Sequence, residues 1–518
     1  MVRWAVGDMT GRSEAAVDGG IARHETPSYG NLSVALVLSV VVAAWLGEHL
    51  SALRTIVATA MVLLVRCLLH RLVVTQRMRV LAAVLVAVCS VCAFGRSRVE
   101  WQATGRDLPH NIDGVATIVS DPDPVGRAVR VVIDVDGVHY ESWTYGRLAR
   151  TISRLEPGRR VLVKGALQVV DGEHRRRLAL RHVLGRVRID SIDTEALGVR
   201  ERGIDLAANR LRSSMRSGVS LLSFPLDELF AGLVYGDDRA QPDDMVARFR
   251  ESGLAHLTAV SGQNVVYVLT VFGVLLGSLR RWWRLVATIA VLGWFVVLTR
   301  AEPSVLRAAT MAAVAALGFA VGGRHRTVDV LAISMVLLVI VDPFLVWSVG
   351  WWLSVGGTTG LVVLAPLLVQ AFTSRRGAPP GPVMGALITT LAAQCGVSPV
   401  MITVFGWPNA LSIAANLLAV PIAGVVMLVG IPVSIVSGLV PRALGSLAMR
   451  PVGVMVWWVD RVAALGARLH PPLVVDIAAV VATWACVAMA VWSAVVGARS
   501  STRVPTLGHG RLPLPRSR

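Results

Sequence analysis

The sequence predicts a polytopic α-helical membrane protein of about 12 transmembrane helices with an inserted extracytoplasmic small β-barrel domain that is OB-fold-like. First, 54% of the 518 residues are hydrophobic and only 16% are charged, whereas an ordinary globular protein has about 25% charged residues. Second, apolar segments of about 20 residues, the length of a helix that crosses a bilayer, recur in both halves of the chain. Third, a polar region with short strand-like segments interrupts them at residues 96–193.

The chain begins with a polar tail that is followed by apolar spans. Residues 1–30 mix acids, bases and glycines without apolar periodicity, which favours a cytoplasmic tail over a cleaved signal peptide. Residues 31–95 are predicted to form the N-terminal transmembrane helices. The expected spans are 31–47, 51–70, which Arg66 interrupts, and 79–95.

Residues 96–193 are predicted to form the extracytoplasmic β domain. Asp-Pro, Asp-Gly and Pro-Gly turns separate its alternating segments, which is typical of short strands. Five or so strands and a small helix around Arg147–Arg154 fit the partly open barrel of an OB-fold, and a generic small barrel fits the strand count equally well. The expected strands are 115–119, 129–134, 161–170 and 178–189, with a further aromatic strand over 139–145.

The second half of the chain returns to apolar spans. Residues 194–250 are predicted to form amphipathic helices on the membrane surface, because Ile204–Leu222 places arginines among leucines and valines. Residues 251–497 hold the other transmembrane helices, and residues 498–518 form a basic cytoplasmic tail. The expected spans are 253–277, 283–299, 303–322, 327–345, 347–372, 382–404, 410–438, 449–466 and 473–496.

Arginines fall in every second loop between the expected spans. Arg280 with Arg281 and Arg375 with Arg376 are examples, while the intervening loop at 405–409 has no basic residue. Basic loops of membrane proteins stay in the cytoplasm, whereas a long loop can be translocated despite its charges. The pattern therefore predicts a protein of the cytoplasmic membrane with both termini in the cytoplasm and the β domain outside.

The densest polar sequence at membrane depth is residues 252–264, which include His256, Ser261, Gln263 and Asn264. On a helix His256 and Gln263 lie on one stripe, with Asn264 beside it. Such groups are costly in lipid unless they face a protein partner or a water-filled path. Helix–helix hydrogen bonding and lining of a substrate path are both compatible with this spacing, and a helix broken at Gly262 would offer free NH groups to an anion.

Single polar residues interrupt later spans and are further candidates for lining a path. Arg307 stands about one turn inside its span, where an arginine can face a polyanion or reach the outer interface as an anchor. Gln394 and Asn416 also stand within apolar segments, where each alone is more often a packing contact.

Aromatic and basic residues of the β domain are candidates for binding single-stranded nucleic acid. Aromatic side chains combined with arginines are how OB-folds hold single strands without sequence preference. Packing in the domain core is the alternative for the aromatic residues. The candidates are Tyr140, Trp143 and Tyr145 on the aromatic strand, and Arg175, Arg176 and Arg177 in a basic turn.

The sequence predicts no metal site, no cofactor and no catalytic residue. Asp237-Asp238 and Asp243-Asp244 lack an accompanying histidine, so a solvated turn and a helix N-cap are expected there. Cys89 and Cys92 stand without a second such pair and are a weak metal or redox signal. The single lysine, Lys164, precedes a glycine, which excludes a Walker-type nucleotide site. We therefore expect that the chain is not an enzyme.

Several segments together resemble the ComEC family of competence membrane proteins. The polar sequence from Gly253 to Asn264 resembles the signature of that family. The other matching segments, in order, are Leu233–Asp237, Pro303–Ala308, Asp342-Pro343, Leu353-Ser354, Gln394 with Pro399 and Phe405-Gly406, and Asn416–Pro421. The resemblance is strong over about residues 220–490 and looser before them.

The resemblance implies that residues 251–497 form a competence-type transmembrane channel domain. It implies that this channel carries single-stranded DNA inward across the cytoplasmic membrane during natural transformation. It also implies two partners, a cytoplasmic DNA-translocating ATPase and an extracytoplasmic DNA receptor. The polar residues of the spans would then line the DNA path.

Two departures from the family pattern limit what is carried over. Many members have Leu-His where this chain has Gln263-Asn264, so a role of that histidine is not transferred. Longer members continue into a metallo-β-lactamase-like domain, which is not seen before Arg518. A short form is therefore expected, and degradation of the other DNA strand would need a separate nuclease.

Two other functional classes are compatible with the same residues. A small-solute transporter or exporter would use broken helices at the membrane midplane. A structural membrane protein with no transport role would use the polar residues only to pack helices.

Overall fold

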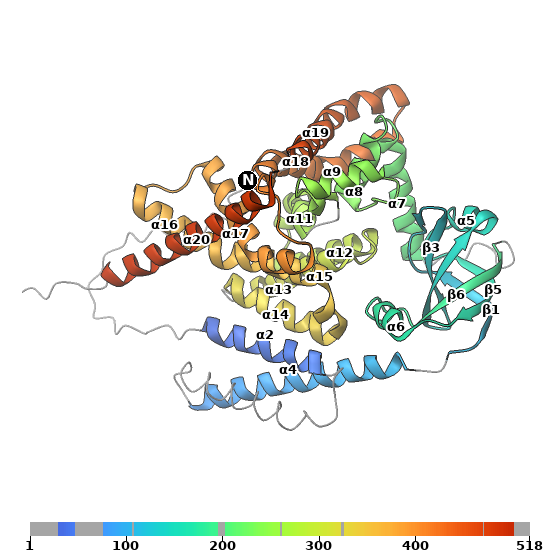
Figure 1. The fold of residues 1–518 in the computed structure, drawn as a ribbon, viewed down its shortest axis with the longest axis horizontal. Coiled ribbons are helices and arrows are strands. Elements are labelled where there is room, and N and C mark those ends of the chain that lie inside the picture. The colour runs from blue at the N-terminus through green and yellow to red at the C-terminus, as the bar shows by residue number, and fades with distance from the viewer. Residues whose placement is uncertain are drawn as a thin grey trace, which may run out of the picture.

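The computed structural model describes residues 29–46, 76–105, 108–194, 203–258, 262–322, 326–469 and 471–501. The predicted span 51–70, nearly all of the two predicted tails, and Ser261 lie outside these residues. Among the described residues, a barrel of strands occupies one end of the molecule and helices form the remainder (Figure 1).

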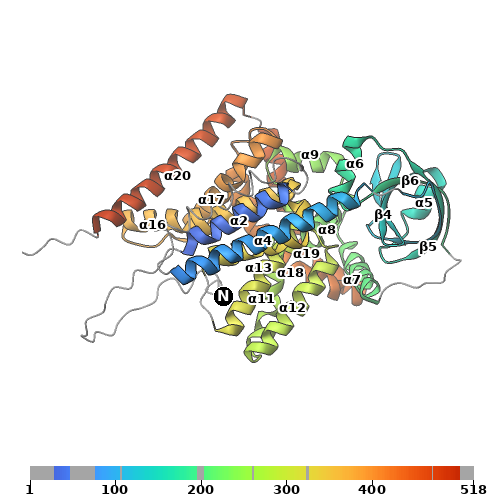
Figure 2. The same ribbon diagram turned by 90° about the horizontal axis from the view of Figure 1, so that it is seen from below.

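The helices divide into three groups along the chain. Before the barrel come α2 (Tyr29–Leu46) and α4 (Gln76–Ala103), which lie side by side in both views (Figures 1 and 2). After the barrel come the shorter helices α7 (Gly203–Val219), α8 (Leu226–Tyr235), α9 (Asp243–Glu251), α10 (Ala255–Thr258) and α11 (Gly262–Gly277). The remaining helices are α12 (Arg281–Leu298), α13 (Pro303–Val321), α14 (Thr327–Val341), η1 (Pro343–Trp347), α15 (Val349–Thr359), η2 (Gly360–Leu364), α16 (Ala365–Arg376), α17 (Pro382–Val404), α18 (Ser412–Leu439), α19 (Arg442–Arg468) and α20 (Leu473–Ser501).

Six helical stretches of the described residues are long and apolar enough to cross a membrane. They are Arg281–Leu298, Ser304–Val321, Val349–Arg376, Pro382–Val404, Ser412–Leu439 and Leu473–Ser493. The chain is therefore a multi-pass membrane protein, as the sequence predicted. The expected total of about 12 spans is not confirmed.

Two of the predicted spans take a different form for identifiable reasons. The predicted span 253–277 is divided, and its helical remainder α11 has only 16 residues. The predicted span 449–466 lies within α19, which also contains Arg450, Asp460 and Arg461. Four valines of α19, at positions 452, 456, 459 and 462, are buried against α18 and neighbouring helices, while Arg450 and Arg461 are exposed, so α19 is amphipathic.

The barrel closes through five strands in the order β1-β5-β6-β4-β3-β1, with the short β2 added on β3. Its strands are β1 (Asn111–Ile118), β2 (Asp123–Val125), β3 (Ala128–Val135), β4 (Val138–Tyr145), β5 (Arg160–Gln168) and β6 (Gly185–Asp193). Closure is complete because β1 pairs with β5 along most of its length and with β3 at its end. The expectation of a partly open barrel was wrong on this point.

Two helices interrupt the strands of the barrel. The predicted small helix is confirmed as α5 (Gly146–Ile152), between β4 and β5. A second helix, α6 (Gly172–Ala179), contains the arginines that were expected in a turn, because Asp171 caps its first turn by accepting a hydrogen bond from His174 N. The last strand consequently begins at Gly185, later than predicted. The start of the domain also moves, since α4 continues through Ala103.

Helix α7 was expected to place its apolar side on the membrane surface, but protein covers much of that side. Its apolar side packs on α18, and Met215 and Val219 are buried there. Gly218 of α7 lies directly against the backbone carbonyl of Ser434 in α18, so the two helices meet without intervening side chains. The apolar face that lipid would have covered is covered by protein.

A similar close approach joins α15 to α17 and gives a first prediction. A Cβ atom added at Gly396 would overlap the carbonyl oxygen of Gly356. We expect Gly396→Val to destabilise the fold by about 1–3 kcal/mol or more, because the helices must separate. The measurement is the melting temperature of the detergent-solubilised protein. Gly385→Val is the control in the same helix, since nothing lies within 4 Å of a Cβ there; equal melting temperatures for the two variants would contradict the prediction.

Candidate functional site

The polar sequence at 252–264 contains α10 and the start of α11, and residues 259–261 between these helices lie outside the described residues. Helix α10 ends at Thr258 and α11 begins at Gly262. A Cβ atom at Gly262 would stand 3.0 Å from the Cβ of Ala308, so the start of α11 rests on the first turns of α13. Gly253 has a positive φ of 76°, and a Cβ there would stand 2.6 Å from the Cβ of Ser412 in α18. Glycines thus allow this segment to pack between α13 and α18.

The polar side chains of this sequence have different surroundings. His256 on α10 is exposed, and so is Gln263, whose Nε2 donates to the hydroxyl of Tyr267 over 2.6 Å. Asn264 is buried, and its Nδ2 donates to the carbonyl of Leu233 over 3.2 Å. Asn264 therefore ties α11 to α8, whereas His256 and Gln263 stay accessible.

Arg307 is the most unusual side chain of the helical region. It is only 2% exposed, and neither Nη1 nor Nη2 has a hydrogen-bond partner among the described residues. Arg307 lies on α13 one turn before Met311, so the two side chains are on the same face of that helix. Met311 packs against residues of α14 and α15. An ionised group in such surroundings is costly unless a counter-charge reaches it.

Gln394 lies on α17 and Asn416 lies on α18. Gln394 of α17 lines a small cavity together with Ser412 of α18, which is the residue that touches Gly253. Asn416 of α18 is half-buried, and its Oδ1 has no hydrogen-bond partner among the described residues. Through Gln394 and Ser412, α17 and α18 thus lie next to the segment that contains Gly253.

The aromatic candidates of the barrel do not form one binding face. Tyr140 is buried in the barrel core. Trp143 lies between the guanidinium groups of Arg130 and Arg186, 6.0 and 5.9 Å from its ring, and its Nε1 donates to Glu141 over 2.9 Å. Tyr145 alone is fully accessible, at 64% exposure.

The basic candidates on α6 are also largely engaged. The guanidinium of Arg176 lies 5.9 Å from the ring of Trp101 at the end of α4, so it contacts the helical region. Arg177 pairs with Glu173 on the same helix, and Arg175 is exposed.

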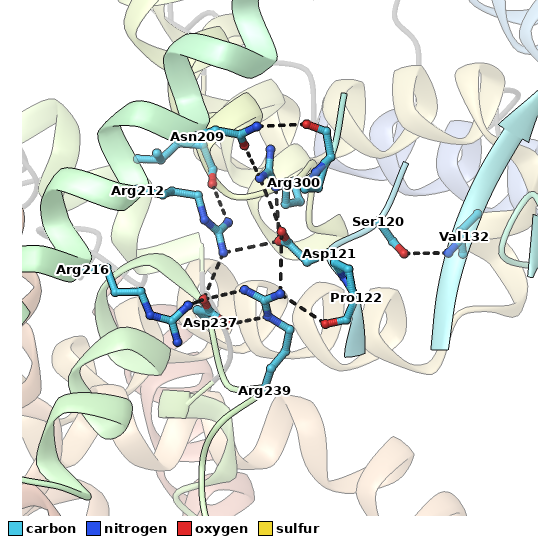
Figure 3. A network of polar contacts seen from close by, with 12 residues as sticks. Ser120, Asp121, Pro122, Val132, Asn209, Arg212, Arg216, Asp237, Arg239 and Arg300 are labelled. Atoms are coloured by element: carbon cyan, nitrogen blue, oxygen red, sulfur yellow. Dashed lines mark hydrogen bonds and ion pairs between the residues drawn. The ribbon is translucent and has the colours of Figure 1, made fainter. Parts of the chain in front are cut away.

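Figure 3 shows the polar network that attaches the barrel to the helices, which we call the arginine junction. Asp121, from the barrel loop between β1 and β2, lies 3.2 Å from Arg300, 3.4 Å from Arg212 and 3.8 Å from Arg239. Asp237, after α8, pairs with Arg239 over 2.7 Å and with Arg212 over 3.5 Å. Arg216, the fourth arginine, also reaches Asp237 over 3.5 Å. Two carboxylates thus hold arginines from α7, from the α12–α13 loop and from the segment after α8.

The solvated turn expected at Asp237 was therefore wrong, since this side chain is only 4% exposed. Burial alone would raise the pKa of Asp237, but the hydrogen bond from Arg239 and the charges of Arg239, Arg212 and Arg216 lower it to about 2. Asp243 and Asp244 do lie in the first turn of α9, where a negative charge interacts favourably with the helix dipole.

A second contact attaches the barrel at a different loop. His182, which precedes β6, lies 3.1 Å from the carboxylate of Asp342 after α14. The hydrogen bond to Asp342 raises the pKa of His182. Next to this pair, the rings of Trp101, Phe344 and Trp347 meet edge to face at 5.0 and 5.5 Å. With two separate attachments, the barrel has a fixed orientation relative to α13 and α14.

A comparison with protein families identifies the chain. A family model described as Competence protein matches residues 233–500, which is more than half of the chain. The chain belongs to this family. The matched region contains the polar sequence at 252–264 and Arg307, and the resemblance to the ComEC family is confirmed.

Two curated relatives each match slightly less than half of the chain. ComE operon protein 3 of Bacillus subtilis (strain 168) is 26% identical over 245 residues, which are 47% of this chain and 30% of that protein. Uncharacterized protein YcaI of Escherichia coli (strain K12) is 27% identical over 258 residues, 46% of this chain and 33% of that protein. The matches thus span about a third of each relative's length. No solved structure gives a significant match.

The arginine junction leads to a prediction about stability. We expect Asp237→Asn to destabilise the protein by roughly 2–4 kcal/mol, because it leaves arginines without their counter-charge at a largely buried site. Chemical denaturation in detergent measures the change. Asp244→Asn is the control, since its carboxylate is 72% exposed and its loss should change stability by less than about 1 kcal/mol.

The lowered pKa of Asp237 gives a prediction about pH. Its folded pKa of about 2 is below the ordinary value of 3.8, so its contribution to stability is complete above about pH 4 and disappears as the pH falls through about 2. The stability difference between the parent and Asp237→Asn should therefore shrink from pH 4 to pH 2. A difference that stays constant over this interval would contradict the assignment.

Proposed function

We propose that this protein is a channel through which single-stranded DNA enters across the cytoplasmic membrane during natural transformation. Membership of the competence family supports a role in DNA uptake. The similarity to ComE operon protein 3 of Bacillus subtilis, over 47% of this chain, agrees with that role. The specific role as a channel rests on the arrangement of side chains in that region.

Arg307 is the single observation that carries this proposal. Its guanidinium group lies among apolar helices with both Nη atoms unpartnered in the described part of the chain. A buried positive charge becomes favourable when an anion approaches it, and guanidinium forms charge-assisted hydrogen bonds with phosphate. A phosphodiester group that passes α13 would supply the missing counter-charge.

The N-terminal end of α11 supports the same path. The start of α11 at Gly262 rests on α13, the helix that carries Arg307. The first NH groups of a helix attract anions. The exposed side chains of His256 and Gln263 add hydrogen-bonding groups beside that helix start. We assign to them, with Ser261, the role of lining the path, and to Asn264, Gln394 and Asn416 the role of holding the lining helices.

The distribution of arginines supports an outer position of the barrel. The end of α12 meets the barrel through Arg300, so the start of α12, with Arg281 and Arg284, lies at the opposite end of that helix. Basic residues mark the cytoplasmic ends of membrane helices. The barrel would then lie outside, and both chain termini would lie in the cytoplasm.

The strand order of the barrel supports a contact with DNA before the membrane. The strand order β1-β3-β4-β6-β5, with β4 and β6 parallel and a helix between β4 and β5, supports the proposal that the barrel is OB-fold-like. Such barrels bind single strands through arginines and exposed aromatic side chains. In this barrel Tyr145, Arg175, Arg176 and Arg177 are the exposed members of the predicted set, and Arg177 is paired with Glu173.

Transport inward needs a source of energy that the chain does not supply. Moving each phosphate against a negative interior costs about 2.3 kcal/mol per 100 mV. The sequence has no Walker motif, so the chain itself is proposed to be a non-enzymatic conduit without a cofactor. We propose that a cytoplasmic DNA-translocating ATPase pulls the strand, an outside receptor delivers it, and a separate nuclease removes the other strand.

The proposed channel predicts that DNA uptake is lost when the charge of Arg307 is removed. We expect Arg307→Gln to reduce uptake of fluorescent DNA at least tenfold while the amount of protein in the membrane stays unchanged. Arg307→Lys keeps the positive charge and should retain part of the uptake. Arg280→Gln, which removes a charge from the loop before α12, is the control and should behave like the parent.

Two other outcomes would contradict the proposal. Unchanged uptake in Arg307→Gln would remove Arg307 from the path. The second outcome is that transport of a small anion depends on Arg307 while DNA uptake does not. This result would favour a small-solute transporter, because a buried arginine can also bind a small anion.

A further inference from the structure

A group of unpaired arginines surrounds one exposed tyrosine on the barrel, and we call it the α5 patch. It consists of Arg127, Tyr145, Arg147, Arg150 and Arg154, all of which are exposed. None of its four arginines forms an ion pair, a side-chain hydrogen bond or a ring contact within the described residues. In contrast, Arg130, Arg177, Arg186 and Arg188 of the same barrel are all paired with carboxylates.

The backbone gathers these residues from two parts of the chain. Arg147 and Arg150 lie on α5, and the turn after α5 continues with a hydrogen bond from Arg154 N to the carbonyl of Thr151. The spacing i, i+3 places Arg147 and Arg150 on one side of α5, and Arg154 follows in the turn after the helix. Ala128 is the strand partner of Tyr145, so the neighbouring Arg127 joins the patch from the β2–β3 turn.

The charge of the patch is not balanced locally. The sequence has no acidic residue between Glu141 and Glu156, which encloses Tyr145 and three of the arginines. Exposed arginines that are not neutralised create a positive potential that attracts polyanions and depends on salt. The patch therefore has the electrostatic character of a surface that binds a chain of phosphates.

The geometry points to the α5 patch as the surface of the barrel that binds the phosphodiester backbone of single-stranded DNA, with Tyr145 stacking on one base. This inference rests on the proposed function and names a binding surface for it. Successive arginines on one helix face are about 5–6 Å apart at Cβ, which is comparable to the distance between neighbouring phosphates of a strand. The exposed ring of Tyr145 favours a nucleic acid over an acidic peptide, because a base stacks on it.

The position of α5 also favours DNA over a membrane surface. Figures 1 and 2 both show α5 on the side of the barrel that faces away from the helices. The patch is therefore on the side of the barrel opposite to the helices that are long and apolar enough to cross a membrane. Tyr140 faces the barrel core, and Trp143, on the opposite face of β4, lies against Arg130 and Arg186, so both rings are less free to bind a base than Tyr145.

The experiment measures binding of a short fluorescent oligothymidylate to the full chain in nanodiscs at several salt concentrations. The test variant combines Arg147→Gln, Arg150→Gln and Arg154→Gln. We expect its Kd to rise at least tenfold at 0.1 M salt, and the slope of log Kd against log salt to fall by about 2, since each phosphate contact contributes about 0.7. Replacing the same arginines by lysine should restore most of both quantities.

The control removes three positive charges from another side of the same barrel, in Lys164→Gln, Arg181→Gln and Arg188→Gln. It should keep the slope and the Kd of the parent within about twofold. Tyr145→Ala should raise the Kd roughly tenfold without changing the slope, because stacking does not release counterions.

The outcomes separate this inference from the proposed function. A parent that binds the oligonucleotide, with a test variant of equal Kd and slope, would overturn the α5 patch alone and leave an acidic protein partner as its ligand. A parent that binds no oligonucleotide would overturn both. Loss of binding in the test and control variants alike would show a general charge effect and would also overturn the patch.

Discussion

The cost of an ionised group in apolar surroundings determines how this structure can work. The chain meets that cost in two ways. At the arginine junction, Asp121 and Asp237 supply counter-charges for arginines from three different segments, so the charges are neutralised within the protein. At Arg307 the described residues supply no such partner, although this side chain is more deeply buried than any arginine of the junction. The first arrangement fixes the structure, and the second requires an anion from elsewhere.

These two arrangements are close in sequence and mechanically connected. Arg300, which pairs with Asp121 of the barrel, comes only seven residues before Arg307 in the sequence. Arg300 and Ala301, in the loop between α12 and α13, both have a positive φ. Non-glycine residues adopt positive φ at a cost that neighbouring contacts must offset. Local hydrogen bonds offset this cost, because Arg300 N donates to the carbonyl of Val297 and Ala301 N to that of Val296 at the end of α12. The ion pair between Arg300 and Asp121 thus joins the barrel to the loop that precedes α13.

The sequence predicted what depends on local periodicity and missed what depends on long-range contacts. Apolar length predicted the membrane helices, and alternation predicted most strands, because burial in lipid or in a barrel core imposes those periods directly. The arginine junction was missed because Asp121 and Arg300 are about 180 residues apart and each resembles an ordinary loop residue. The α5 patch carried a usable signal, the spacing of Arg147, Arg150 and Arg154, but that segment was interpreted only as a helix. Tyr140 and Trp143 could not be separated from Tyr145 by sequence, since only the closure of the barrel decides which ring is buried.

A channel for a polyanion must bind each phosphate firmly enough to admit it and weakly enough to release it. The surfaces proposed for DNA differ in this respect. An exposed cluster such as the α5 patch makes several screened contacts, which concentrate the strand near the entrance but weaken with salt. One buried arginine makes a single strong contact, which offsets part of the cost of placing a phosphate among apolar helices. Several arginines at the depth of Arg307 would hold the strand in place, so a single one is better suited to passage than a cluster. The electrical cost of roughly 2.3 kcal/mol per 100 mV for each phosphate is not changed by a site that binds and then releases it, so in the proposed channel the whole of this cost falls on the proposed motor.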